Sequence, residues 1–365
     1  MPERSGHDVV VVGAGIIGLA CAWRARQRGL SVLVVDGAEP GSGASRVAAG
    51  MIAPVTEAEF GAEDLLRLNL AAHSRWPAFA EELGGELHHR LSGSLVVAAD
   101  RDDAEELHRL HEFQRSVGLD AEWLTPSECR RLEPALSPRV GGGILAKHEQ
   151  QVDPAAVVSQ LVAQGLEIES GDPVVAVDEQ GVRLGSGATR AADQVVIAAG
   201  SWSGSGIDGL PELPVRPVKG QILALRRPAD RPLTDRFIRT PRCYVLDRGD
   251  GRLVVGGTME ERGFDTEVTV DGVYRLLEAA WEVLPDVAEL QFEGAQAGLR
   301  PGTPDNAPII GRGEPVNVIF ATGNYRHGVL HTPITAESVA ELLTGGEPPA
   351  AVAGFSPDRF GVTVR

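Results

Sequence analysis

The stretch HDVVVVGAGIIGLACAWRARQRGLSVLVVDG, residues 7 to 37, decides the fold class of this chain. Four valines, Val9 to Val12, have the pattern of a buried strand, and the apolar residues from 17 to 27 recur at helical spacing. Gly29 then ends the helix, and a second apolar run ends at Asp36. A strand, a helix and a strand in this order predict an α/β fold with a Rossmann-like domain.

Three glycines between the first strand and the helix, Gly13, Gly15 and Gly18, have the spacing G-x-G-x-x-G of a dinucleotide site. Gly13 allows a tight turn, Gly15 lets the backbone approach a pyrophosphate, and Gly18 lets helix and sheet pack closely. Asp36 lies where a carboxylate accepts hydrogen bonds from a ribose, which disfavours a 2′-phosphorylated cofactor. A glycine turn that binds no ligand is the alternative, but it would not explain why Asp36 stands at the end of the second strand.

A second G-x-G-x-x-G triplet, Gly204, Gly206 and Gly209, lacks this context. Pro211 and Pro214 follow where a helix would have to run, so we expect a loop there. One dinucleotide site is predicted, whereas a flavin reductase that uses NAD(P)H would carry two such units.

The rest of the chain alternates between helical and extended patterns. Apolar spacing predicts helices over 63–83 and 102–116, and Asp153 with Pro154 opens a helix to about Gln164. Residues 192–202 read as a buried parallel strand that ends in small residues. Alternating segments between residues 215 and 292 (GQILALRR, CYVLDRG, RLVVGGTM and EVTVDG) predict an antiparallel sheet, interrupted by a helix over 271–283. The segment from 317 to 345 returns to strand, glycine loop and helix.

Composition excludes several classes of partner. A net charge of −17 opposes binding to nucleic acid or to an anionic membrane. No apolar run approaches the length of a membrane span, and the polar opening lacks the features of a signal peptide. Three cysteines without a C-x-x-C pair favour a reducing compartment, so we expect a cytoplasmic protein. His88, His89, His108 and His111 have no ligand partners at zinc spacing, and no metal site is predicted.

Arg300 stands before Pro301 in AGLRPGTPDNAPIIG, residues 297 to 311. Proline restricts the preceding residue to extended backbone, so Arg300 is expected at a strand end. A cation held in this way implies a bound anion, with a surface ion pair as the alternative.

Several motifs in a fixed order extend this interpretation: GAGIIG, SRVAAGMIAP, VVIAAGSWSG, PVKGQ, CYVLDR, LVVGGTM, AGLRPGT and GNYRHGVLHTP. With them the chain resembles the D-amino-acid oxidase superfamily of FAD-dependent oxidoreductases, and within it the glycine oxidases, from about residue 7 to 360. The resemblance implies oxidative deamination of glycine or another small amino acid, with oxygen as acceptor, and a link to thiamine biosynthesis. Sarcosine or small D-amino-acid oxidases and dehydrogenases remain alternatives, as do a flavin module that acts on tRNA and a flavoprotein without turnover.

The resemblance also implies site residues. FAD would be bound without a covalent bond, because covalent relatives place a cysteine in the segment aligned with AGLRPGT and this chain has none there. The residues implied to contact FAD, together with those of the glycine loop, are Gly13, Ala14, Gly15, Ile17, Gly18, Asp36, Gly43, Ser45, Arg46, Ala49, Gly50, Met51, Val174, Ala199, Gly200, Trp202, Asn324, His327, Gly328, Val329 and Leu330. Plain core packing is the alternative for Trp202.

On the substrate side, the resemblance assigns the substrate carboxylate to Arg300 and Tyr244 and places Arg326 in the active site. A guanidinium presents two parallel donors to a carboxylate, which a lysine does not. Met51, Ala53 and Met259 are expected to crowd a small pocket, with core filling as the alternative for Met259. We expect a homo-oligomer to be possible. The domain division implied is an FAD-binding domain from residues 1–85, 151–214 and 296–365, and a discontinuous substrate domain from residues 86–150 and 215–295.

Overall fold

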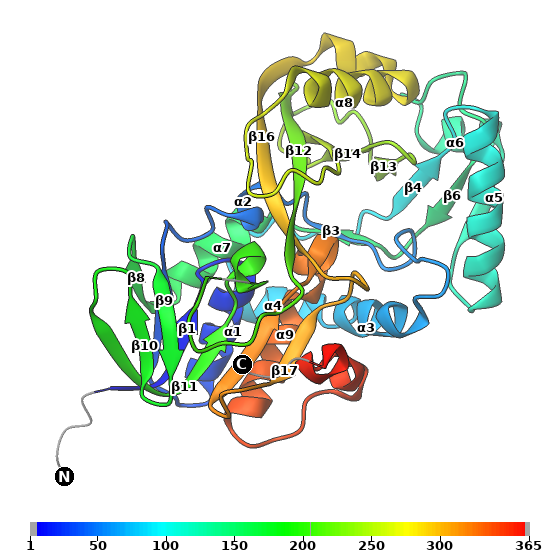
Figure 1. Ribbon diagram of the computed structural model, residues 1–365. Helices are drawn as coiled ribbons and strands as arrows, with labels where there is room; N and C mark the ends of the chain where they lie inside the picture. Colours follow the sequence, from blue (N-terminus) through cyan, green and yellow to red (C-terminus); the bar gives the residue numbers. More distant parts are fainter. Residues whose placement is uncertain (1–5, 205, 362–365) are drawn as a thin grey trace.

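The computed structural model describes residues 6–204 and 206–361. Two sheets organise it, one in the lower part of Figure 1 and one in the upper part, where the long strands β12 (Arg216–Arg226) and β16 (Gln291–Gly302) lead toward α8 (Val270–Val283). No helix in these two described ranges combines the length and the apolar content needed to cross a bilayer.

The first sheet is mainly parallel and has the strand order β17-β18-β11-β1-β2-β8. Its strands, with the hairpin β9–β10 that extends β11, are β1 (His7–Val12), β2 (Val32–Asp36), β8 (Glu167–Ser170), β9 (Val174–Asp178), β10 (Gly181–Leu184), β11 (Thr189–Ile197), β17 (Ile309–Arg312) and β18 (Val318–Thr322). The unit β1–α1–β2, with α1 at Ile16–Gln27, confirms the predicted strand, helix and strand.

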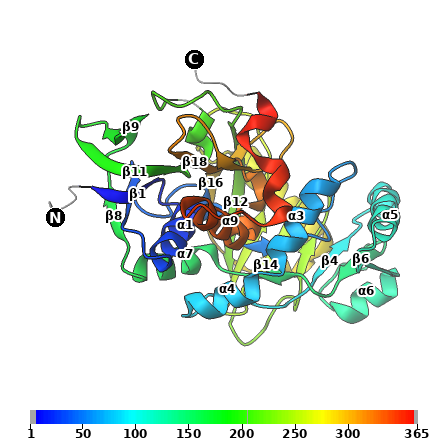
Figure 2. The ribbon, with the colours of Figure 1, turned by 90° about the horizontal axis from the view of Figure 1, so that it is seen from below.

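The valines of β1 alternate between two cores. Val9 and Val11 pack into the core beneath α1 and α9 (Gly328–Leu343), whereas Val10 and Val12 pack into the core on the other face. Burial on both faces explains why a central parallel strand is continuously apolar. Figure 2 shows α1 and α9 side by side under this sheet, where they contact each other.

The second sheet has the strand order β16-β12-β15-β14-β13-β4-β6-β5. Its remaining strands are β4 (Ser94–Val97), β5 (Glu122–Leu124), β6 (Gly143–Ala146), β13 (Phe237–Arg239), β14 (Tyr244–Asp247) and β15 (Arg252–Gly256). The antiparallel pairing predicted between residues 215 and 292 is confirmed for β12 to β16. The sheet also includes β4, β5 and β6, which were not predicted as part of it, and β4 runs parallel to β13. A separate two-stranded ladder joins β3 (Met51–Ile52) to β7 (Gln150–Gln151).

Helices cover both sheets. Besides α1, α8 and α9, they are α2 (Ala44–Val47), α3 (Glu63–His73), α4 (Trp76–Leu83), α5 (Arg101–Ser116), α6 (Pro126–Leu132) and α7 (Pro154–Ala163), with 3₁₀ turns η1 (Gly200–Gly204), η2 (Pro285–Glu289), η3 (Tyr325–His327), η4 (Ala350–Phe355) and η5 (Pro357–Phe360). Asp153 caps α7 as predicted, since its carboxylate accepts a hydrogen bond from the Ala155 N–H at 3.0 Å.

Two element predictions are wrong. The helix predicted over 63–83 is two helices, because Pro77 has no N–H with which to continue the hydrogen bonds of α3, and it instead occupies the first turn of α4. EVTVDG, residues 267 to 272, is not a strand: Thr269 accepts a hydrogen bond from the Gly272 N–H and caps α8. The loop predicted at the second glycine triplet is confirmed, since residues 206–215 contain no helix.

Candidate active site

A cavity of about 920 Å³ is lined by residues of both sheets. It begins at the carboxyl end of β1 and reaches the strand ends of β14 and β16. Of the site residues proposed from the sequence, those on its wall are Gly13, Gly15, Ile17, Asp36, Gly43, Ser45, Ala49, Gly50, Met51, Val174, Ala199, Gly200, Trp202, Tyr244, Met259, Arg300, Asn324, Arg326, Gly328 and Val329. The cavity therefore brings together groups that lie about 300 residues apart in the chain.

Five of the residues proposed to contact FAD are not on the wall. Ala14 donates its N–H to Asp36 Oδ2 at 2.6 Å. A Cβ on Gly18 would lie 1.9 Å from the carbonyl oxygen of Gly13. Both residues therefore stabilise the glycine turn without lining the cavity. Arg46 is exposed, and Leu330 belongs to the core under the first sheet. His327 is buried, and its Nδ1 lies 3.3 Å from Glu57 Oε2.

The glycine turn forms one end of the cavity. Gly13 has φ +112°, a conformation that favours glycine, and a Cβ there would lie 2.4 Å from the carbonyl oxygen of Ala198. Gly15 differs, because a Cβ on it would meet only Ser45 Oγ, at 3.4 Å, and would otherwise point into open space. That space is where a ligand can approach the backbone at the start of α1.

Asp36 and Ser45 are both engaged with the backbone beside this turn. Asp36 accepts hydrogen bonds from Ala14 and, at 2.8 Å, from Ala38, one on each oxygen. Because a carboxylate has about four acceptor sites, the carboxylate retains capacity for ribose hydroxyls. Ser45 Oγ accepts a hydrogen bond from the Ile16 N–H at 2.9 Å, so it satisfies one of the free donors of α1.

Arg300 lies on β16 near the other end of the cavity. Its Nη1 donates to the carbonyl oxygens of Thr258, at 3.0 Å, and Lys219, at 3.5 Å. Within the described ranges no carboxylate lies within 4.0 Å of this guanidinium, and its Nε and Nη2 donate no hydrogen bond to these residues. Gly220 makes room for it, since a Cβ on Gly220 would lie 2.2 Å from Nη1. Arg300 is thus a half-buried cation with free donors on the cavity wall.

Tyr244 on β14 lies beside this arginine. The position of a Cβ on Gly257 is 3.1 Å from Arg300 Nη2 and 3.3 Å from the Tyr244 hydroxyl, so the two groups converge on the same backbone. Burial raises the pKa of Tyr244, although the charge of Arg300 opposes this effect. The hydroxyl is therefore protonated at neutral pH and available as a hydrogen-bond donor.

Arg326 and the first turn of α9 form another part of the wall. Arg326 Nη2 lies 3.3 Å from the carbonyl oxygen of Glu57, and the same atom forms an ion pair with Glu59 at 2.5 Å. The N–H groups at the start of α9, around Gly328 and Val329, carry the partial positive charge of a helix N-terminus.

Glu57, which sequence reasoning missed, lies between Arg326 and a second arginine, Arg239. Its carboxylate lies 3.3 Å from Arg239 Nη2 and 3.3 Å from His327 Nδ1, and its side chain is on the cavity wall. Burial alone would raise the pKa of Glu57, but the charges of Arg239 and Arg326 and the hydrogen bond with His327 outweigh it and hold the pKa well below its usual range. In the sequence Glu57 is one of several acids in a polar stretch, and nothing there separates it from a solvated acid.

Arg239 was also not predicted as a site residue, although the sequence around it contains a strand pattern that indicates its position. It is the register partner of Tyr244 in the β13–β14 pair, and side chains of directly opposed residues share one face of a sheet. Strand alternation through Phe237 and Arg239 would have placed this arginine next to Tyr244 if β13 had been predicted. Arg242, in the same hairpin, also lines the cavity and forms an ion pair with Glu282.

Two apolar side chains on the cavity wall are largely exposed. Trp202 is 52% exposed, and its ring centroid lies 5.6 Å from that of Phe264, so it is not a core residue. Met259 is 67% exposed and accepts a hydrogen bond from the Tyr325 hydroxyl at 2.8 Å, so core filling is excluded for it as well. Ala53, expected to crowd the pocket, is fully buried behind the wall.

Comparison with known proteins assigns this cavity a cofactor. A model of the family "FAD dependent oxidoreductase" (DAO) matches residues 8–342. The chain belongs to this family. The cradle fits FAD, because Gly15 leaves open space at the start of α1 while Asp36 retains acceptor sites at the same end. This FAD dependent oxidoreductase therefore has the α/β fold and the Rossmann-like domain predicted from its sequence.

Three relatives illustrate the similarity. The glycine oxidase of Geobacillus kaustophilus is 33% identical over 97% of both chains, and its crystal structure superposes with a TM-score of 0.90 over 98% of this chain and 99% of that one. The bifunctional protein ThiO/ThiG of Synechocystis sp. is 34% identical over 98% of this chain, which spans about half (54%) of that relative. The iminodiacetate oxidase IdaA of Chelativorans sp. BNC1 is 25% identical, with a TM-score of 0.85 over 96% of this chain and 98% of that one.

Cysteine positions bear on how the oxidoreductase holds FAD. Cys243 lines the cavity, but burial raises the pKa of its thiol to about 11, so the thiolate that would form a flavin bond is scarce at neutral pH. No cysteine occurs between residues 297 and 311.

Proposed function

We propose that this FAD dependent oxidoreductase oxidises the amine of glycine or another small amino acid. The observation that carries the proposal is Arg300, a half-buried cation with free donors and no carboxylate partner within 4.0 Å in the described ranges. A substrate carboxylate satisfies this charge, and the Tyr244 hydroxyl beside it adds a further donor. The glycine oxidase relative supports the choice of a small amino acid.

The proposed role of these groups is orientation. Two parallel N–H donors on Arg300 fix the plane of a carboxylate, and the α-carbon then has one direction in which to point. FAD, when bound, supplies the chemistry by accepting a hydride from that carbon and passing the electrons to oxygen. Glu57 does not act as a general base at neutral pH, because its pKa is held well below its usual range. The remaining site residues, in the cofactor and substrate roles that the sequence resemblance assigns, are part of this proposal.

A panel of amines tests the proposal by release of hydrogen peroxide and by anaerobic bleaching of the flavin. Glycine, sarcosine, D-alanine and D-proline separate the proposed activity from the sarcosine and D-amino-acid alternatives. Iminodiacetate joins the panel because one of the relatives described above is an iminodiacetate oxidase. Bleaching without peroxide would indicate a dehydrogenase, and absence of bleaching with every amine would contradict the proposal.

The tRNA alternative has no support from the relatives described above, and the net charge of −17 opposes it. The ThiO/ThiG relative supports the further proposal that the imine product enters thiamine biosynthesis, which complementation of a thiamine-requiring strain tests. All three cysteines are free and buried, in agreement with the proposed cytoplasmic location.

We also propose that the protein forms a homo-oligomer. Helix α8 is apolar on its outer side as well as its inner side, because Val270, Tyr274, Leu277 and Trp281 are exposed at helical spacing. Light scattering after size exclusion, on wild type and on Trp281→Glu, measures the oligomeric state. An unchanged monomeric mass in both would contradict this proposal.

A further inference from the structure

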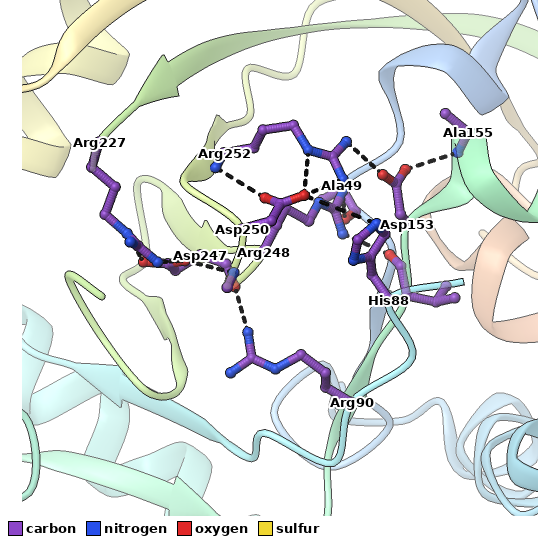
Figure 3. Close-up of polar contacts among 12 residues, drawn as sticks. Ala49, His88, Arg90, Asp153, Ala155, Arg227, Asp247, Arg248, Asp250 and Arg252 are labelled. Carbon is purple, nitrogen blue, oxygen red and sulfur yellow. Dashed lines mark hydrogen bonds and ion pairs between the residues drawn. The ribbon is translucent and has the colours of Figure 1, made fainter. Parts of the chain in front are cut away.

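Arg248, the last residue of the CYVLDR motif, has no role in the site described above. It follows β14 in the second sheet, is almost fully buried, and does not line the cavity. Its side chain reaches the segment around Ala49 (Figure 3), where Nη2 donates to the Ala49 carbonyl at 2.6 Å. Its Nη1 donates to the Val152 carbonyl, also at 2.6 Å. One guanidinium thus joins three separate segments of the chain.

The two carbonyl groups belong to neighbouring pieces of backbone beside the cavity. Val152 donates its N–H to the Gly50 carbonyl at 2.9 Å, and a Cβ on Gly50 would lie 1.9 Å from the Val152 carbonyl oxygen. Ala49, Gly50 and Met51 all line the cavity. Arg248 therefore bonds both sides of the close backbone contact from which the cavity wall is built.

Acidic groups compensate the buried charge. Burial lowers the pKa of Arg248 to about 10, while the charge of Asp153 raises it, so the guanidinium remains protonated at neutral pH. Asp153 is held in turn by Arg252 Nη1 at 2.7 Å, and Arg252 Nε donates to Asp250 at 2.8 Å (Figure 3). The cluster is satisfied, and such networks hold their members in one geometry.

We propose that Arg248 is a positioning residue that holds the backbone of Ala49 to Met51 in the shape that binds FAD. Without it, two buried carbonyl groups lose their charged donor, and the wall segment relaxes before the cofactor arrives. The inference rests on FAD binding, a property of the family, and is independent of the proposed action on glycine.

Arg227 provides a matched control. It lies in the same part of the second sheet and forms a buried two-point pair with Asp247, at 2.6 and 2.7 Å, immediately before Arg248 in the chain (Figure 3). It is also almost fully buried, yet its hydrogen bonds within the described residues go to Asp247 and Pro228 and not to Ala49 or Val152, and it does not line the cavity. Its loss should destabilise the sheet without changing the FAD site.

The test measures FAD binding to the apoprotein. Quenching of flavin fluorescence gives the Kd, and visible circular dichroism reports the environment of the bound flavin. Arg248→Met should raise the Kd for FAD about tenfold or more and alter the dichroism, by analogy with the loss of metal affinity when a residue that orients a metal ligand is removed. Arg248→Lys, which retains the charge but not both bonds, should lie between. Arg227→Met should lower the melting temperature and leave the Kd within about twofold of wild type.

Two results would overturn the proposal: a Kd in Arg248→Met equal to wild type, or an equal rise in Arg227→Met. If Arg248→Met does not fold, Arg248→Lys decides, because a folded lysine variant with wild-type Kd and dichroism excludes the positioning role. Neither readout involves a substrate.

Discussion

Gly13, Gly15 and Asp36, at one end of the cavity, come from one short stretch near the N-terminus, and the two glycines offer backbone alone. The opposite end is formed by side chains from distant segments, among them Glu57, Tyr244 and Arg300. A pyrophosphate is recognised by backbone N–H groups at a helix end, whereas a carboxylate is recognised by charged side chains. Changes at the first end should therefore abolish cofactor binding, and changes at the second should alter substrate use in a protein that keeps its FAD.

The largest effect is expected at the cofactor end. Gly15→Val places a branched side chain in the open space beside α1, and the variant should purify without bound FAD. Absorbance at 450 nm relative to 280 nm measures the flavin content. Gly354→Val is the control, because a Cβ there also meets open space but lies outside the cavity wall. A yellow Gly15→Val protein with wild-type flavin content would break the comparison.

At the substrate end, Arg300→Leu should lower kcat/KM for glycine by about two orders of magnitude or more, because charge-assisted hydrogen bonds contribute ~1.5 to 3 kcal/mol each. Arg300→Lys should be intermediate, since it keeps the charge but not the planar pair of donors. Both variants should retain FAD. Steady-state peroxide assays and the visible spectrum measure these outcomes.

Arg101→Leu, at an exposed ion pair on α5, is the matched control and should behave as wild type. An amine without a carboxylate should show little difference between wild type and Arg300→Leu. Wild-type efficiency of Arg300→Leu with glycine would make Arg300 a structural residue and remove the main support for an amino-acid substrate.

A smaller effect is expected at Glu57. Glu57→Gln removes the negative charge beside Arg239, Arg326 and His327, and kcat/KM for glycine should fall about tenfold, as for other residues that orient a site. Glu59→Gln is the control, because Glu59 pairs with Arg326 at a more exposed position and should change kcat/KM less than about threefold. Equal effects of the two variants would show that the buried position of Glu57 is unimportant.

The same residue predicts a pH dependence of stability. The folded-state pKa of Glu57 lies below its ordinary value of 4.5, so its carboxylate stabilises the fold above that value and loses this contribution as the pH falls further. The melting temperature of wild type should therefore fall more steeply than that of Glu57→Gln below about pH 5. Parallel curves would show that Glu57 is not held ionised by its neighbours.

The smallest effect is expected at Met259 on the cavity wall. Met259 is mostly exposed, so Met259→Ala should change kcat/KM for glycine less than about threefold and improve use of larger D-amino acids such as D-phenylalanine. Relative rates across a size series measure the change. A large loss of kcat/KM with glycine would indicate instead that Met259 contacts the substrate.

Local sequence patterns predicted what depends on neighbours in the chain. The glycine spacing, the valines of β1 and the acid at Asp36 predicted the nucleotide site, because each acts through backbone geometry within one strand–helix–strand unit. Pro301 likewise placed Arg300 near the end of its strand, where β16 carries it. Alternation alone misled at residues 267–272, where a helix cap used the threonine of an apparent strand.

The sequence by itself thus determined the α/β class, the nucleotide turn and the presence of a constrained arginine. Only the tertiary structure decided which charged side chains pair with each other and with backbone carbonyl groups. Glu57 and Arg239 are 182 residues apart in the chain and 3.3 Å apart in space, and Arg248 reaches two carbonyl groups that precede it by 96 and 199 residues. Whether a charged side chain is solvated or paired depends on burial and on partners brought from elsewhere, and neither is encoded in the spacing of nearby residues.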